Sequence, residues 1–206
     1  MICASADLSN SDKTDGFLKQ TKALVKGDFS GAFFQAGVAE LTMACCCIGM
    51  SLHGGVIPAC GTFFVFSDYM KPAVRMAALM QLPVKFIWTH DAFRVGEDGP
   101  THEPVEQEAQ IRLMEKLKNH SGKNSCLVLR PADAKETTVA WAMAMENTDT
   151  PTALIFSRQN INNLPEGNDY EQARKGGYVV AGSDDNPDVV LVATGSEVST
   201  LVSGAE

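Results

Sequence analysis

The stretch THDAFRVGEDGPTHEPVEQ, residues 89–107, carries two His, five acidic residues, one Arg and two Gly, with no hydrophobic periodicity. This composition predicts a loop, and a loop so rich in His and carboxylate groups is better suited to chemistry than to spacing. His90 and His102 bracket the turn-forming sequence GEDGP. The alternative is a solvated acidic loop whose His side chains cap helices. A metal site is a weaker interpretation, because no second cluster of ligands accompanies the loop.

A second candidate is Glu40, the last residue of FFQAGVAE, which leads into the otherwise apolar helical sequence ELTMACCCIGM. A carboxyl group at the mouth of an apolar segment can hold or share a proton with a nitrogen atom of a ligand. The alternative is an ordinary first-turn Glu that the helix dipole favours.

A third candidate is the aromatic set in CGTFFVFSDYMKP, where Phe63, Phe66 and Tyr69 recur every three residues. On a helical turn these rings would share one face and could form a wall for a flat heterocycle. The alternative is that the three rings belong to the hydrophobic core.

Apolar, strand-like runs alternate with helical patterns, and these elements must position the candidate groups. Strands that are apolar on both faces predict an α/β fold, with a mostly parallel sheet and helices on both faces. Loops that follow such strands meet at one edge of the sheet, where ligands bind. The predicted strands are residues 1–6, 56–60, 84–89, 126–131 and 152–157, and the predicted helices are residues 37–53, 67–81, 105–119 and 134–147.

Composition excludes several classes of function. The chain has 206 residues, and 17 Lys and Arg against 25 Asp and Glu give a net charge of −8, unlike a nucleic-acid-binding protein. No apolar run is long enough to span a membrane, and the start MICASADLSNSDK lacks the features of a secretory signal. We therefore expect a cytoplasmic protein.

Six Cys are present, and three of them are adjacent in an apolar helical run. They are interpreted as small buried hydrophobic residues in a reducing compartment, and a metal site or redox switch is the alternative. The six are Cys3, Cys45, Cys46, Cys47, Cys60 and Cys126.

The chain divides into three parts. Residues 1–165 form the α/β domain, in which Asp133 and Glu136 have the spacing of a helix capping box. Residues 166–185 are polar and rich in Gly, and they predict an exposed linker. Residues 186–206 predict a fresh strand, a Gly-Ser turn and the start of a helix, too little to bury a core. We expect this last part to be the truncated start of a further domain.

Seven stretches, taken together and in order, resemble transketolase, a thiamine-diphosphate enzyme. Related deoxyxylulose-phosphate synthases carry a different version of the loop GEDGPTHEPVEQ. The resemblance identifies residues 1–165 as the middle, pyrimidine-binding domain and residues 186–206 as the start of the C-terminal domain. The seven stretches are SADLSNS, GVAE, GTFFVFSDYMKPAVRMAALM, THDAFRVGEDGPTHEPVEQ, LVLRPAD, SRQN and NPDVVLVATGSEVSTLV.

The resemblance implies a role for each matching residue. Glu40 would hydrogen-bond the aminopyrimidine ring and act catalytically, and His102 would act on the reacting hydroxyls of the donor. Asp7, Phe63, Phe66 and Tyr69 would contact the cofactor. The residues implied in substrate binding are Ser11, His90, Asp98, His102 and Arg158.

The resemblance also implies partners. The family's diphosphate-binding domain is marked by GDG followed by Asn, which supply ligands of Mg²⁺ (or Ca²⁺), and no GDG occurs here. We therefore expect no metal ligands in this chain and activity only with a diphosphate-binding domain from another chain. The expected partners are sugar-phosphate substrates and either a second copy in a homodimer or a chain that carries the diphosphate domain. An exposed apolar surface should mark where missing domains pack. The alternatives are a non-catalytic interaction fragment, or a related dihydroxyacetone or deoxyxylulose-phosphate synthase.

Overall fold

Six strands form one sheet in the order β2-β1-β3-β4-β6-β5, and every neighbouring pair is parallel. The structure, a computed structural model, describes residues 1–92, 94–166, 169–182 and 186–205. The strands are β1 (Ile2–Ser5), β2 (Phe33–Gln35), β3 (Pro58–Phe63), β4 (Lys85–Thr89), β5 (Leu127–Leu129) and β6 (Thr152–Ile155).

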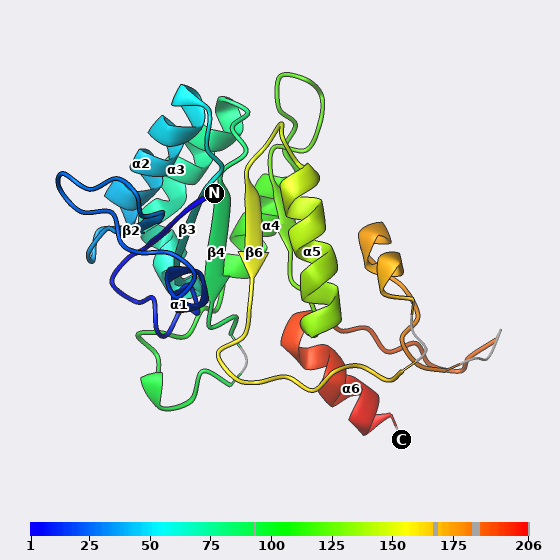
Figure 1. Cartoon of the computed structure of the whole chain (residues 1–206). Coiled ribbons are helices and arrows are strands. Elements are labelled where there is room, and N and C mark those ends of the chain that lie inside the picture. Colours follow the sequence, from blue (N-terminus) through cyan, green and yellow to red (C-terminus); the bar gives the residue numbers. More distant parts are fainter. Residues whose placement is uncertain (93, 167–168, 183–185, 206) are drawn as a thin grey trace.

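The predicted helices occur where the apolar periodicity placed them, with ends shifted by a few residues (Figure 1). Asp133 caps α5 as predicted, because its Oδ1 accepts the backbone N–H of Glu136 at 2.8 Å. The α-helices are α1 (Asp15–Leu18), α2 (Glu40–His53), α3 (Ser67–Leu79), α4 (Gln107–Lys116), α5 (Ala134–Glu146) and α6 (Val198–Gly204). The 3₁₀ helices are η1 (Phe64–Phe66), η2 (Gly96–Asp98), η3 (Tyr170–Lys175) and η4 (Gly195–Glu197).

Helices cover both faces of the sheet, which confirms the predicted fold class. Alternate strand residues point to opposite faces, so Phe86 and Trp88 of β4 pack with α2, α3 and α4, while Ile87 packs on the other side with residues of α1 and α5. Figure 1 shows α1 and α5 on the near side of the sheet.

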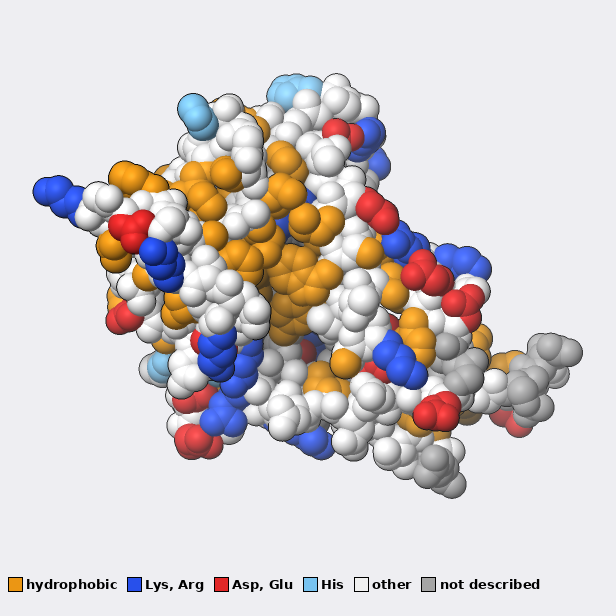
Figure 2. All heavy atoms as spheres, in the orientation of Figure 1, with side chains coloured by type: hydrophobic (Ala, Val, Ile, Leu, Met, Phe, Trp, Pro, Cys, Tyr) orange, Lys and Arg blue, Asp and Glu red, His pale blue; other side chains and the backbone are white. Residues whose placement is uncertain are grey.

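The near face is only partly covered. Figure 2 shows hydrophobic side chains gathered in the middle of this face, where a cavity of about 380 Å³ opens between α1 and α5. Phe17, Ile87, Trp141 and Phe156 are among the residues that line it. An apolar surface of the expected kind is therefore present.

Three segments differ from the sequence-based expectations. The strand β2 and the short helix α1 lie in a region where no element was predicted. The predicted linker contains η3, which packs on α5, where Arg174 forms an ion pair with Glu146. Residues 167–168 and 183–185 lie outside the described residues. The strand predicted near Val189–Val192 is not formed in the described part of the chain, because no strand lies beside it to accept its backbone hydrogen bonds.

The described residues contain no helix long and apolar enough to cross a membrane.

Candidate active site

The loops that follow β1, β3, β4 and β6 meet at the carboxyl edge of the sheet, as the parallel topology requires. Phe63 at the end of β3 pairs with Thr89 at the end of β4, so the residues that follow these two strands are neighbours in space. This brings the aromatic set and the His-rich loop together, although they are more than twenty residues apart in the sequence.

Glu40 is the first residue of α2 and is buried, with 7% of its surface exposed. The chain reaches it through Gly37, whose φ of +72° is a left-handed conformation that Gly adopts without strain. Its Oε1 lies 3.4 Å from the hydroxyl of Thr62 on β3, a long hydrogen bond. A buried carboxyl group held this loosely keeps most of its hydrogen-bonding capacity for another partner.

The aromatic side chains form a stacked row, here called the aromatic ladder, along one side of the helical segment that η1 and α3 make together. Phe63 ends β3, Phe66 lies on η1 and Tyr69 lies on α3. Ring centroids are 5.8 Å apart from Phe63 to Phe66 and 6.0 Å from Phe66 to Tyr69, and both pairs are stacked. Phe63 is buried, whereas Tyr69 is 62% exposed. Phe66 and Tyr69 thus share one side of this continuous helical segment, as predicted, and Phe63 stacks on Phe66 from the residue before it.

His90 lies against the buried end of this ladder. Its ring stacks on that of Phe63 with centroids 3.7 Å apart, and its Nδ1 is 3.0 Å from the hydroxyl of Thr89. Burial lowers the pKa of His90 to about 4, and the nearby charge of Asp98 opposes this shift only in part. The imidazole is therefore neutral near pH 7, and it can accept or donate a hydrogen bond without carrying a charge.

A chain of polar contacts extends from His90 to the surface. The Nε2 of His90 is 3.6 Å from Asp98 Oδ2, and the same oxygen accepts a hydrogen bond from Arg158 Nε at 3.1 Å. Arg158 also pairs with Glu97 at 2.8 Å. His102 completes the group, because its ring lies edge-on to Phe66 with centroids 5.4 Å apart. Four of the predicted site residues thus gather with the aromatic ladder.

Asp7 and Ser11 lie on the loop after β1, and both are exposed. This loop approaches the same edge, since the charge of Lys13 acts on His90. Neither Asp7 nor Ser11 makes a side-chain hydrogen bond to another predicted site residue within the described ranges. Their place in the site remains a proposal.

Asp12, which sequence reasoning missed, holds this loop in shape. It is buried, and its carboxylate accepts hydrogen bonds from the Ser5 hydroxyl at 2.7 Å and from the Thr14 hydroxyl at 2.6 Å. The sequence offered only a weak signal, an Asp followed two residues later by Thr, which is a common turn pattern.

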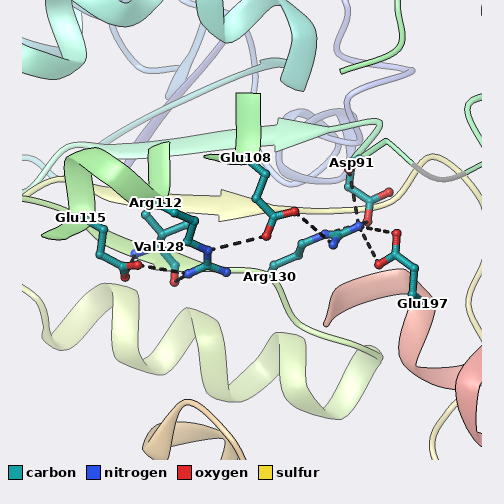
Figure 3. A network of polar contacts seen from close by, with 7 residues as sticks. All are labelled: Asp91, Glu108, Arg112, Glu115, Val128, Arg130 and Glu197. Carbon is teal, nitrogen blue, oxygen red and sulfur yellow. Dashed lines mark hydrogen bonds and ion pairs between the residues drawn. The ribbon is translucent and has the colours of Figure 1, made fainter. Parts of the chain in front are cut away.

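The sequence analysis also gave Arg130 no role of its own, although Arg130 lies in the stretch LVLRPAD. It follows β5, its side chain is 4% exposed, and it binds three carboxylates, those of Asp91, Glu108 and Glu197 (Figure 3). Burial by itself would lower the pKa of Arg130, but the hydrogen bond with Glu197 and the charges of Asp91 and Glu108 raise it overall. A lone Arg after a strand is no sequence signal for such a network.

No group of three or more His, Cys, Asp or Glu side chains arranged to hold a metal ion occurs among the described residues. Cys3, Cys47, Cys60 and Cys126 are buried as interpreted, whereas Cys45 is exposed and Cys46 is half-buried. All six are free thiols, and burial raises the pKa of Cys3 and Cys126 to about 12. Neither thiol is therefore an activated nucleophile.

Comparison with known proteins identifies the family and the fold. Residues 1–163 match the family model for the transketolase pyrimidine-binding domain. The chain belongs to the transketolase family. A transketolase of Halalkalibacterium halodurans is 48% identical over 204 residues, which are 98% of this chain and 29% of that protein. The chain therefore spans less than a third of the length of this transketolase.

Solved transketolase structures share the fold of this chain. Transketolase from Leishmania mexicana matches with a TM-score of 0.86 and 39% identity, covering 99% of this chain and 29% of that chain. A chain described as a split-gene transketolase, an inactive β4 tetramer, matches with a TM-score of 0.59 and 28% identity, covering 80% of this chain and 47% of that one. The predicted family and the α/β fold are thus confirmed.

Proposed function

We propose that this chain supplies the aminopyrimidine pocket and the substrate channel of a transketolase. The reaction would transfer a two-carbon ketol unit from a ketose phosphate to an aldose phosphate, with thiamine diphosphate as the cofactor. One observation carries the proposal. A buried carboxyl group, a stacked aromatic ladder and an Arg–Asp–His chain come from distant parts of the sequence to one edge of the sheet.

The residues of this edge fit the aminopyrimidine ring. Glu40 is buried and has free acceptor capacity, so it would hydrogen-bond a ring nitrogen and hold the proton there. Phe66, whose ring is partly exposed, would stack on the heterocycle, with Phe63 and Tyr69 supporting it from either side. Asp7 would face the cofactor from the loop after β1. The bound cofactor would supply the electron sink for the chemistry.

The substrate would lie along the polar chain. His102 and Asp98 would read the hydroxyl groups of the sugar, with His102 acting on the reacting hydroxyls. Ser11, His90 and Arg158 would hold the sugar phosphate, a task that suits Arg because its planar fork pairs with phosphate oxygens. Arg158 is bound to Asp98 and Glu97 in the free chain, so the phosphate would have to compete with these carboxylates.

The remaining parts of the site would come from elsewhere. We assign residues 1–165 to the pyrimidine-binding domain, residues 166–185 to a linker and residues 186–206 to the start of a C-terminal domain. The cofactor diphosphate and its Mg²⁺ would be held by a diphosphate-binding domain outside these residues. The apolar cavity between α1 and α5 supports packing against further protein.

A second candidate function is assembly without turnover. The split-gene transketolase chain that resembles this one is described as an inactive tetramer, and this chain would likewise self-associate without contributing to turnover. Light scattering with size-exclusion chromatography gives the oligomeric state, and a ketol-transfer assay with and without an added diphosphate-domain chain distinguishes the cases. A homo-oligomer that turns over only when a diphosphate-domain chain is added supports the main proposal, and an oligomer that stays inactive with it supports the second.

The pocket is tested with thiamine, which carries the aminopyrimidine without the diphosphate. Saturation-transfer NMR on the purified chain should detect transfer to the pyrimidine protons, and Glu40→Gln should abolish it. Glu171→Gln is the matched control, because Glu171 is an exposed carboxylate on η3. Equal transfer in the wild-type chain and in Glu40→Gln would refute the assigned role of Glu40.

A further inference from the structure

The turn at η4 docks on Arg130 by shape as well as by charge. A Cβ atom placed on Gly195 would lie 2.6 Å from both Cγ and Nε of Arg130, so no larger residue fits there without displacing the turn. The φ of Gly195 is +59°, which disfavours any side chain further. The turn therefore rests directly on the stem of the Arg130 side chain.

Two polar contacts fasten the same turn. Glu197 binds the Arg130 guanidinium at 2.8 Å, and the hydroxyl of Ser196 donates to Asp91 Oδ2 at 2.8 Å. Arg130 binds that same Asp91 oxygen through Nη2 at 2.8 Å and Nε at 3.2 Å (Figure 3). Asp91 is thus held from two sides, by the end of β5 and by a turn more than a hundred residues further along the chain.

Asp91 is bonded directly to His90, which makes the contact relevant to the site. His90 has a φ of +63°, a strained conformation for a residue with a side chain. Strain of this kind persists only where the surroundings fix the backbone on both sides. On one side His90 is fixed by its stacking on Phe63 at 3.7 Å, and on the other by the anchored carboxylate of Asp91.

We propose that Arg130 and the turn Gly195–Glu197 form a latch that positions His90, and that Arg130, Gly195 and Ser196 are positioning residues for the substrate site. The latch ties the geometry of the His-rich loop to the docking of the segment that follows residue 186. The relevance to substrate rests on the proposed function, but the latch itself does not.

The contacts of the latch are charged and largely buried. Arg130 pairs with three carboxylates, of which Glu108 also pairs with Arg112 at 3.6 Å, and the side chains of Arg130 and Asp91 are 4% and 1% exposed. The Oδ1 atom of Asp91 has no hydrogen-bond partner within the described structure. Withdrawal of the turn removes the Ser196 hydroxyl and admits water to this carboxylate, and the restraint on His90 weakens with it.

The imidazole of His90 reports on the latch without cofactor or substrate. Charged or titratable groups that act on it are Lys13, Asp98, His102 and Arg158, and none of them is changed in the variants below. Burial is the main cause of its low pKa, about 4, so a loosened and hydrated loop should bring the pKa back toward 6.5.

The test is an NMR titration of the His side chains in the purified chain. In Gly195→Ala the His90 midpoint should rise by about one pH unit or more. The matched control is Gly204→Ala on α6, where an added Cβ meets nothing within 4 Å and the midpoint should not move. Protection of the α6 amides from hydrogen exchange shows independently whether the turn is released.

A second variant removes the Ser196 hydrogen bond and the charge of Glu197 without a steric clash. Ser196→Ala/Glu197→Gln leaves the core of the sheet untouched and should move the His90 midpoint in the same direction. Released α6 amides with an unmoved His90 midpoint in both variants would overturn the proposal. Failure of thiamine to bind would count against the proposed function only, so the two failures are distinguishable.

Discussion

The imidazole ring of His90 lies face to face with the phenyl ring of Phe63, their centroids 3.7 Å apart and their planes inclined by 25°. The contact follows from the parallel register, in which Phe63 pairs with the residue before His90. The stack buries His90 and so keeps it neutral. A neutral imidazole at the inner end of a polar chain orients a ligand by hydrogen bonding rather than by charge.

The first prediction concerns pH and stability. The folded pKa of His90 is about 4, below the ordinary value of 6.5, so the unfolded chain binds the extra proton first. The stability contributed by neutral His90 is therefore complete above pH 6.5 and is lost as the pH falls toward 4. The loss reaches about 3 kcal/mol at most. Urea unfolding at pH 7, 6 and 5 measures it.

His90→Gln removes this titration, so stability should fall less steeply between pH 7 and pH 5 than in the wild-type chain. His120→Gln, at an exposed position, is the control for replacing a His by Gln. A His90→Gln variant with the wild-type slope would show that His90 is not the group responsible.

The second prediction concerns Asp133, which joins two parts of the domain. One carboxylate oxygen caps α5 by accepting from Glu136 N, and the other accepts from Leu164 N at 3.0 Å. Asp133→Ala removes both bonds and leaves two buried N–H groups unpaired, so it should lower the free energy of unfolding by about 2–4 kcal/mol. Chemical denaturation measures the change.

Asp169→Ala is the comparison for Asp133. Asp169 caps η3 through the backbone N–H of Glu171, but at an exposed site, where water can replace the bond. Its replacement should cost about 0.5 kcal/mol or less. Equal losses in the two variants would mean that the Leu164 contact contributes nothing.

The third prediction concerns Arg158 in the holoenzyme, with a diphosphate-binding domain present. Arg158→Leu should raise KM for a phosphorylated acceptor by about 10- to 100-fold, because it removes a charge-assisted hydrogen bond to the phosphate. The change in kcat should be smaller. An unphosphorylated acceptor should be nearly unaffected. Arg174→Leu, which removes an Arg that pairs with Glu146 and Glu171 at the surface, is the control. Equal effects on both acceptors would place Arg158 away from the phosphate.

Hydrophobic patterns in the sequence were enough to predict most strands and helices of the α/β domain. The strands β1, β3, β4, β5 and β6 come from short apolar runs without alternation, which are typical of strands buried on both faces of a parallel sheet. The edge strand β2 was missed because it has only three residues and one of its ends is exposed. The strand predicted near Val189–Val192 has the right composition, but strand formation also needs a neighbour, and composition cannot supply one.

The site was predictable in its residue types but not in its connections. The composition of the loop singled out His90 and His102, and the resemblance added Asp98 and Arg158. Nothing in the sequence pairs Arg130 with a turn more than sixty residues away, or places Asp12 beneath Gly61. Such contacts arise because the crossover connections between parallel strands bring distant segments of the chain together. Local sequence patterns do not encode this arrangement.

The last prediction concerns Gly61 on β3, where the backbone passes close to the loop after β1. A Cβ atom there would lie 2.6 Å from Thr14 Cγ2 and 3.1 Å from Asp12 Oδ2. Gly61→Ala should therefore lower the free energy of unfolding by about 1–3 kcal/mol, because it pushes the Asp12 turn off the sheet.

Thr14→Ser removes the clashing methyl group and keeps the hydroxyl that Asp12 binds. Urea denaturation of Gly61→Ala/Thr14→Ser should accordingly recover part of the loss. Gly49→Ala on α2 is the control, since its Cβ would meet nothing within 4 Å and a helix favours Ala. A double variant no more stable than Gly61→Ala would show that the clash with Thr14 is not the cause.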